Sequence, residues 1–71
     1  DCTLGEFANV SPGAILAGAV QVGRTALIGM GATINLGVRI GDGARVGNSA
    51  VVKKDVPENG IVRAGAVWPP D

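Results

Sequence analysis

The sequence predicts an all-β fold, a parallel β-helix of about three coils with a triangular cross-section. The prediction depends on a six-residue repeat, on glycines at fixed places within it, and on the exclusion of charged residues from its apolar positions. Along residues 4–56 every sixth residue is a branched aliphatic: Leu4, Val10, Leu16, Val22, Ile28, Ile34, Ile40, Val46 and Val52. Four residues after each comes a small or β-branched apolar residue: Ala8, Ala14, Val20, Ala26, Ala32, Val38, Ala44, Ala50 and Val56.

This period excludes an amphipathic helix. A step of six residues along an α-helix turns about 240° net, so the aliphatic side chains would spiral around the axis. In extended chain, positions two or six apart share one face. The two apolar residues of each unit therefore point the same way from a short strand of about four residues. Three strands with sharp corners make one coil, and coils stack at roughly 4.8 Å.

Glycines mark the expected corners of each coil. Five of them directly follow the branched aliphatic residue: Gly5, Gly23, Gly29, Gly41 and Gly47. Four more come three residues after it, where a bend can require a positive φ: Gly13, Gly31, Gly37 and Gly43.

Charged residues avoid both inward positions of the repeat. Between Cys2 and Val56 they are Glu6, Arg24, Arg39, Asp42, Arg45, Lys53, Lys54 and Asp55, and none falls on an inward position. An unpaired charge in a dry interior would be very costly, so this pattern supports a closed apolar core.

The bulk composition narrows the class of protein. A chain of 71 residues is a single small domain. Its formal net charge is zero, which argues against a nucleic-acid partner or an anionic membrane surface. No membrane-spanning run and no signal peptide is found, and we expect a cytoplasmic protein. The first residue is not Met, so we expect the chain to be a fragment or a processed domain.

The single cysteine, Cys2, excludes an internal disulfide and a zinc cluster. It falls on an inward position for small residues, which predicts a buried thiol. Phe7 falls on a corner and is expected to face outward, either as a contact with another subunit or with a missing N-terminal portion, or as an ordinary exposed aromatic.

The C-terminal part departs from the repeat. The next aliphatic position after Val52 falls on Glu58, so the register breaks. We expect a β-helix over residues 1–56, followed over residues 57–71 by a loop and a C-terminal cap of the same domain. In that cap Ile61 and Val62 begin a covering strand, and Trp68 is a lid over the open end of the core.

The hexads resemble those of the hexapeptide-repeat acyltransferases, which fold as left-handed parallel β-helices and work as homotrimers. The left-handedness comes from this resemblance, because parallel crossovers are generally right-handed. Three segments, residues 1–7, 10–14 and 50–57, are similar to sugar acetyltransferases of the NeuD and PglD type. These enzymes transfer an acetyl group from acetyl-CoA to a sialic acid or to the amine of a nucleotide-linked sugar. The resemblance covers nearly the whole chain.

The resemblance implies a general base and its orienting acid. The family's catalytic histidine would directly precede Asp1 and so lies outside this chain, and Asp1 matches the orienting acid. A second family position near the acceptor, often histidine, is Asn9 here. The sequence contains no histidine, so we expect the chain by itself to lack the proton acceptor.

The resemblance also implies contacts to acetyl-CoA as the acyl donor. The donor would lie along a groove between neighbouring prisms and bond mostly to backbone groups at the corners. The matching cofactor-binding residues are Gly18, Met30, Gly31, Asn48, Lys53 and Lys54, with the two lysines near the phosphates. The alternative is that the glycines serve only the corners and that the lysines form a solvated pair. Near the family's adenine site, Gly65-Ala66-Val67-Trp68 replaces a Gly-Asn-Pro-Ala turn.

A second class of function fits the same sequence. The chain can be a non-catalytic trimeric scaffold, in which the repeat assembles subunits while the chemistry lies elsewhere. A γ-type carbonic anhydrase is excluded because it needs three histidines for zinc. In either remaining case we expect a homotrimer with parallel axes, and in the enzyme a sugar or nucleotide-sugar acceptor.

Overall fold

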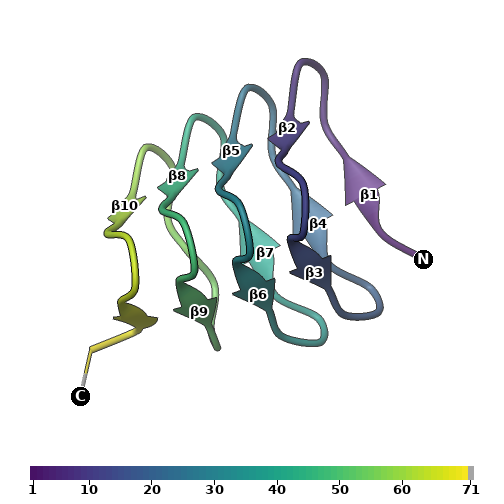
Figure 1. Ribbon diagram of the computed structural model, residues 1–71. Helices are drawn as coiled ribbons and strands as arrows, with labels where there is room; N and C mark the ends of the chain where they lie inside the picture. The colour runs from purple at the N-terminus through teal and green to yellow at the C-terminus, as the bar shows by residue number, and fades with distance from the viewer. Residues whose placement is uncertain (71) are drawn as a thin grey trace.

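The computed structural model describes residues 1–70 and forms an all-β solenoid (Figure 1). Each strand is two residues long, shorter than expected, because a corner follows each inward aliphatic residue directly. The strands of the described chain are β1 (Thr3–Leu4), β2 (Asn9–Val10), β3 (Ile15–Leu16), β4 (Gln21–Val22), β5 (Leu27–Ile28), β6 (Thr33–Ile34), β7 (Arg39–Ile40), β8 (Arg45–Val46), β9 (Val51–Val52), β10 (Ile61–Val62) and β11 (Val67–Trp68). None of the described residues forms a helix long and apolar enough to cross a membrane.

The strands form three parallel sheets, one on each side of the prism. Sheet A has the order β1-β4-β7, sheet B β10-β8-β5-β2, and sheet C β11-β9-β6-β3. Consecutive coils pair in register, with Val22 opposite both Leu4 and Ile40, so one coil contains three hexads. Figure 1 shows the rungs β2, β5, β8 and β10 side by side along the axis. The predicted fold class is confirmed, and the solenoid is consistent with a left-handed parallel β-helix of about four turns.

The two inward rows of the repeat build the core. In the middle coils Ile28, Ile34 and Ile40 are at most 1% exposed, and Ala26 and Ala32 between them are fully buried. No polar or charged side chain is buried within residues 1–70. Each fully buried isoleucine contributes about 1.5–3 kcal/mol relative to an exposed one. The core is therefore a stack of alternating bulky and small hydrocarbon layers.

The corners confirm the expected backbone geometry. Gly13, Gly31, Gly37 and Gly43, each three residues after an inward aliphatic, all have φ between 69° and 78°. The same corner position has a positive φ even where it is not glycine, as at Phe7, Ala19, Thr25, Ser49 and Asn59. Stacking of the coils therefore imposes the left-handed conformation, although a side chain there costs roughly 1–2 kcal/mol.

One coil is two residues shorter than the others. Val22 pairs with Ile40 at a spacing of eighteen, whereas Ile40 bridges to Val56 at a spacing of sixteen. Val56 thus enters the bulky row rather than the small row that the repeat predicts. The shift brings residues 57–68 back into register, and β10 and β11 continue sheets B and C. Ile61 and Val62 form the predicted strand, β10, after a turn at residues 58–59, and with β11 they add a further turn to the solenoid.

The side chain of Asp55 repairs the ladder at the shortened coil. In the coil before it, Gln21 donates its backbone N–H to the carbonyl of Val38 at 3.0 Å. The equivalent donor one coil later, the N–H of Arg39, binds Asp55 Oδ1 at 2.8 Å because the matching carbonyl is missing. The Asp55 carbonyl also accepts a 3.0 Å hydrogen bond from the indole Nε1 of Trp68.

We expect Asp55→Ala to lower the free energy of unfolding by about 1–2 kcal/mol, because the Arg39 N–H loses its acceptor. Asp55→Asn keeps an oxygen in the same place and is expected to lose less than half of that. Urea denaturation of both variants at one protein concentration measures the difference. Equal losses in the two variants would show that the negative charge, and not the hydrogen bond, is what matters.

The two ends of the prism differ. Cys2, predicted to be buried, is exposed, and its Sγ lies 3.2 Å from the carbonyl of Ala17. The prediction is wrong because Cys2 lies in the first coil, where Leu4 is also 53% exposed and no coil covers the inward side chains. At the other end Trp68 is half-buried and packs against the core, as expected of a lid. Phe7 faces outward and is 74% exposed, as predicted.

Candidate functional site

Three corners and three outer strand faces make up the surface of the prism. The AB corner contains residues 5–7, 23–25, 41–43 and 57–59; the BC corner contains residues 11–13, 29–31, 47–49 and 63–65. The CA corner contains residues 17–19, 35–37 and 53–55. Residues of one corner stack above one another, because consecutive coils are in register.

Four of the predicted site residues lie on the CA corner. Asp1 is stacked against the second coil there, and its carbonyl accepts a hydrogen bond from the N–H of Ala19 at 3.0 Å. Gly18 follows one coil later, and Lys53 and Lys54 lie at the far end of the same corner. All four residues are exposed. Three coil steps separate Asp1 from the lysines, a distance of about 14 Å at the strand spacing of a sheet.

The other three predicted cofactor residues lie on the BC corner, across the outer face of sheet C. Asn48 Oδ1 accepts the N–H of Met30 at 2.9 Å, and the N–H of Gly31 binds the Pro12 carbonyl at 3.3 Å. The N–H groups of Met30 and Gly31 therefore already donate to acceptors within the chain. The hydrogen bond of Asn48 holds two coils together. An acyl donor bound at this corner would instead contact the exposed side chain of Met30.

Asn9, the predicted acceptor-binding residue, lies on β2 and is exposed. It belongs to the outer row of sheet B, whereas Asp1 lies on the CA corner, which borders sheets C and A. The two residues thus lie on different sides of a single prism. A site that uses both requires the Asn9 of a second copy of the chain.

A shallow, open hollow on the CA corner lies beside the lysines. It has a volume of about 440 Å³ and is lined by Leu36, Gly37, Val38, Lys53, Lys54 and Asp55. Above it Leu36 extends over Gly18, where an added Cβ would lie 3.3 Å from Leu36 Cδ1. The Leu36 side chain is 74% exposed. Cationic and apolar groups thus meet in one place.

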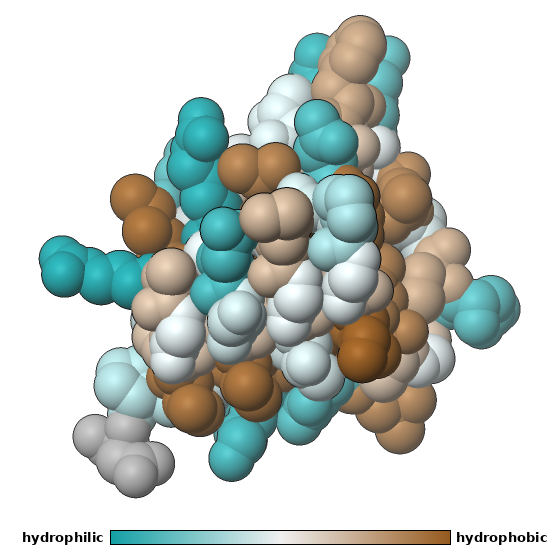
Figure 2. Space-filling view, in the orientation of Figure 1, coloured by the Kyte–Doolittle hydropathy of each residue, from teal (hydrophilic) through white to brown (hydrophobic). Residues whose placement is uncertain are grey.

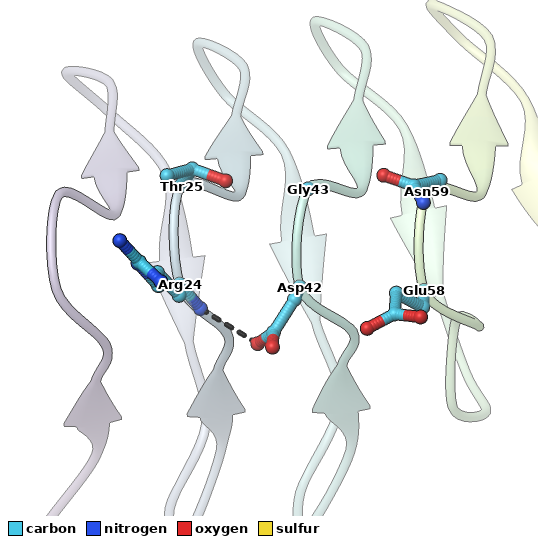
Figure 3. Close-up of a pocket in the computed structure, with 6 residues that line it drawn as sticks. All are labelled: Arg24, Thr25, Asp42, Gly43, Glu58 and Asn59. Carbon is cyan, nitrogen blue, oxygen red and sulfur yellow. Dashed lines mark hydrogen bonds between the residues drawn. The ribbon is translucent and has the colours of Figure 1, made fainter.

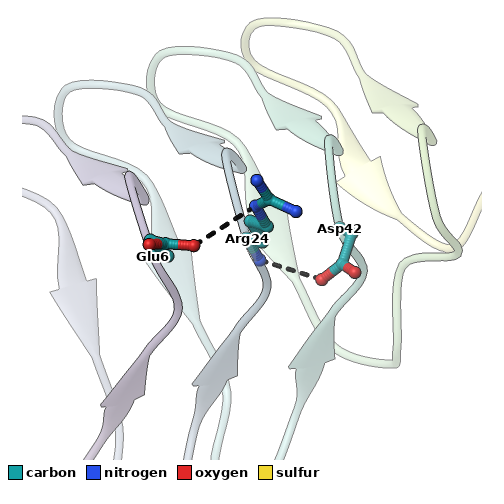
Figure 4. Close-up of polar contacts among 3 residues, drawn as sticks. All are labelled: Glu6, Arg24 and Asp42. Atoms are coloured by element: carbon teal, nitrogen blue, oxygen red, sulfur yellow. Dashed lines mark hydrogen bonds and ion pairs between the residues drawn. The ribbon is translucent and has the colours of Figure 1, made fainter.

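The AB corner carries a ladder of charges (Figure 4). Arg24 Nε lies 3.6 Å from Glu6 Oε1, and the Arg24 N–H donates to Asp42 Oδ1 at 2.8 Å. Both side chains of the ion pair are about two-thirds exposed, so the pair contributes at most about 1 kcal/mol. Its position along the stacked corner indicates a structural role.

A smaller hollow of about 230 Å³ lies beside that ladder, and its six lining residues are drawn in Figure 3. Thr25 and Asn59 extend their polar ends over Gly43 from the two adjacent coils, as Figure 3 shows. An added Cβ on Gly43 would overlap the amide oxygen of Asn59. No group of three or more metal-ligating side chains occurs within residues 1–70, so this corner presents no metal centre there.

The outer face of sheet C is the apolar side of the prism. Its outward row contains no charged residue: Ile15, Thr33, Val51 and Val67. Exposed Met30 and Leu36 border it on the two corners. In the coil that contributes Val51 to sheet C, the outward residue is instead charged on the other two sheets. It is Arg39 on β7 of sheet A and Arg45 on β8 of sheet B. Figure 2 shows several apolar side chains, with hydrophilic ones between them, along the lower edge of the view, the side on which β3, β6 and β9 lie in Figure 1.

Comparison of the chain with protein-family models, curated proteins and solved structures gives no match. A function for this chain is therefore inferred from the chemistry and the placement of its residues. Two residues of the CA corner, Leu36 and Asp55, were not predicted from the sequence to belong to a site. The signal for them was the spacing of Ile61-Val62 from Arg45-Val46, which is two residues short of a full coil.

Proposed function

We propose that the chain is the β-helix domain of an acetyl-CoA-dependent acetyltransferase that acts on a sugar, either a sialic acid or a nucleotide-linked amino sugar. The observation that carries the proposal is the alignment of Asp1, Gly18 and the two lysines along one corner. These are the residues that the resemblance assigns to the orienting acid, to the donor's arm and to its phosphates. The pantetheine arm is a chain of about twelve bonds, as long as about four extended residues or roughly 14 Å. That length matches the distance between Asp1 and the lysines.

In this proposal Asp1 holds and orients a base supplied by the residue before it. The base takes a proton from the acceptor hydroxyl or amine, whose oxygen or nitrogen then attacks the acetyl carbonyl carbon. The carbonyl–sulfur bond breaks, and the thiolate of CoA takes up a proton as it leaves. Asn9 of a neighbouring copy supplies amide donors and an acceptor for the hydroxyl groups of the sugar.

A homotrimer with parallel axes completes such a site. The predicted contacts lie on two corners of the prism, CA and BC, that a single chain cannot bring together across sheet C. A neighbouring copy can place its BC corner and its Asn9 beside the CA corner of the first. The uncharged outer row of sheet C, bordered by exposed Met30 and Leu36, is the surface that such packing would cover.

The trimer is tested by placing a charge on that surface. We expect light scattering at micromolar concentration to give a trimer for the native chain and a monomer for Ile15→Arg, because Ile15 is 61% exposed on sheet C. The control Gln21→Arg places the same charge on the exposed face of sheet A and is expected to remain trimeric. A native monomer, or a trimer in the Ile15→Arg variant, would contradict the proposed packing.

The enzymatic part is tested by binding and by restoring the base. Calorimetry is expected to give heat on titration with CoA. Addition of one histidine directly before Asp1 is expected to raise acetyl transfer to an amino sugar by about 10²–10⁴-fold, the usual contribution of a positioned general base. CoA binding without any gain on adding the histidine would argue against Asp1 as the orienting acid.

Two observations favour the alternative, a non-catalytic trimeric scaffold. The sequence contains no histidine, and the corner amides of Met30 and Gly31 bond within the chain. A trimer that gives neither heat nor a thermal shift with CoA would support the scaffold over the enzyme.

A further inference from the structure

One turn of the AB corner pairs an asparagine with a glycine. Asn59 is exposed, has a φ of 59°, and is followed by Gly60. After the other positive-φ corner residues the chain has alanine or valine, which fill the small inward row. Gly60 departs from this rule because an added Cβ would lie 2.9 Å from the Pro57 carbonyl oxygen and 2.9 Å from Val56 Cγ1. The corner therefore requires glycine directly after Asn59.

The side-chain amide of Asn59 has no role in joining the coils. It extends over Gly43 beside the hollow in Figure 3, and it forms no hydrogen bond with residues 1–70. Asn48, on the other hand, is held by the bond between its Oδ1 and the Met30 N–H. The three other asparagines precede residues with a side chain: Asn9 precedes valine, Asn35 leucine and Asn48 serine.

The backbone nitrogen of Gly60 is the group that can attack this amide. Glycine has no Cβ that would hinder ring closure. In the closed corner the Gly60 N–H donates to the Pro57 carbonyl at 2.9 Å. Within residues 1–70 the corner is joined only to the coil before it, where the Asn59 N–H binds the Asp42 carbonyl at 2.8 Å. Few bonds must therefore break before the nitrogen can reach Asn59 Cγ.

We propose that Asn59 is a site of spontaneous deamidation, with water as the co-reactant. The Gly60 nitrogen gives its proton to hydroxide and bonds to Asn59 Cγ. The Cγ–Nδ2 bond then breaks, and Nδ2 leaves as ammonia after taking a proton from water. Water opens the cyclic imide at one of its two carbonyls, which gives aspartate or isoaspartate. In total, asparagine and water become the acid and ammonia.

The reaction needs neither an acyl donor nor a trimer. The AB corner lies opposite sheet C, so the proposed trimer leaves Asn59 accessible.

Isoaspartate at residue 59 would loosen the end of the solenoid. Its main chain is one carbon longer, whereas the Arg45 N–H holds the Gly60 carbonyl in register at 2.9 Å. Strands β10 and β11 follow directly, and β11 carries the half-buried Trp68 that packs against the core. The added length therefore shifts the coil on which the Trp68 lid depends.

The charges around Asn59 act in the same direction. The charged residues that line its hollow are Arg24, Asp42 and Glu58. Arg24 is already paired with Glu6 at 3.6 Å. Deamidation adds a third carboxylate beside Asp42 and Glu58, and like charges repel.

Peptide mapping of the full chain by mass spectrometry tests the site, after incubation at mildly alkaline pH with and without urea. We expect the mass increase of one deamidation at Asn59, mostly as isoaspartate, and no change at Asn48. The folded chain is expected to react about tenfold more slowly than the chain in urea, because the corner must open first. The control Asn59→Ser should fold natively and gain no mass, since Ser49 occupies an equivalent corner position with a φ of 61°.

Two results would overturn the assignment of the site. One is an unmodified Asn59 in the folded chain after about a hundred half-times of the reaction in urea. The other is a first modification of the folded chain at another asparagine.

Trp68, the only tryptophan, reports on the effect of the modification. The modified chain carries one more negative charge and is separated from the native chain by anion exchange. We expect the isoaspartate form to lose the fluorescence of the packed lid at a lower urea concentration than the native chain. Asn59→Asp adds the charge without lengthening the main chain and should lie between the two. An isoaspartate form with the native midpoint would overturn the loosening, and a midpoint equal to that of Asn59→Asp would overturn the longer main chain as its cause.

Discussion

Replacing Ile34 by alanine is expected to lower the free energy of unfolding by about 2–5 kcal/mol. Ile34 is fully buried in the middle coil and packs between the equivalent inward residues of the coils before and after it. Truncation leaves a cavity that the stacked backbone cannot close, because each coil is fixed by hydrogen bonds on both sides. Urea denaturation followed by circular dichroism, at fixed protein concentration, measures the loss.

Ile61→Ala is the matched control, because Ile61 is the same residue type on a strand but is 67% exposed. It is expected to change the free energy of unfolding by no more than about 0.5 kcal/mol. Comparable losses at Ile34 and Ile61 would mean that the inward and outward rows are not what the repeat indicates.

Replacing Gly41 by alanine is expected to cost about 3 kcal/mol or more. An added Cβ would lie 2.5 Å from the backbone nitrogen of Glu58 and 2.7 Å from the carbonyl carbon of Pro57. Both atoms belong to the backbone of the next coil, so the clash is relieved only by separating two coils. The loss is measured as for Ile34.

Gly37→Ala separates the two roles of glycine in this fold. Gly37 has a φ of 73° and no atom within 4 Å of an added Cβ, so only the left-handed conformation opposes the change. We expect a loss of about 1–2 kcal/mol, since other corners already tolerate side chains there. A larger loss at Gly37 than at Gly41 would contradict the assigned roles.

Most of the fold follows from the sequence because the repeat leaves little freedom. Apolar residues such as Ile28 and Ala32 recur at fixed intervals, and the interior of a triangular prism is the one place that can bury both rows. The positive-φ corners follow from the same register. The length of each strand, two residues rather than four, does not follow from the sequence, because only the hydrogen-bond pattern decides where a corner begins.

The departures from prediction arise where a local pattern competes with stacking. Val56 satisfies the repeat in the small row, yet its bridge to Ile40 places it in the bulky row because the coil closes two residues early. Cys2 has the pattern of a buried residue but lies in the first coil, where no neighbour covers it. The positions of Val56 and Cys2 both depend on contacts between coils, and the sequence of a single coil does not determine these contacts.

The candidate site is only partly predictable for a related reason. Residues such as Gly18 and Lys54 are assigned one by one through resemblance, and their alignment on the CA corner follows from the coil length. That Asn48 bonds to the backbone of Met30 depends on side-chain orientation. The hollow beside Leu36 depends on an absence, two residues missing from one hexad, and only the paired register reveals it.

A titration of the ¹⁵N-labelled chain with CoA, followed by amide chemical shifts, tests the central claim most directly. The account predicts that the largest shifts run along the CA corner, at Gly18, Leu36 and Lys54, while the AB corner at Arg24 and Asp42 stays unchanged. Shifts confined to the AB corner, or none at saturating CoA, would contradict it.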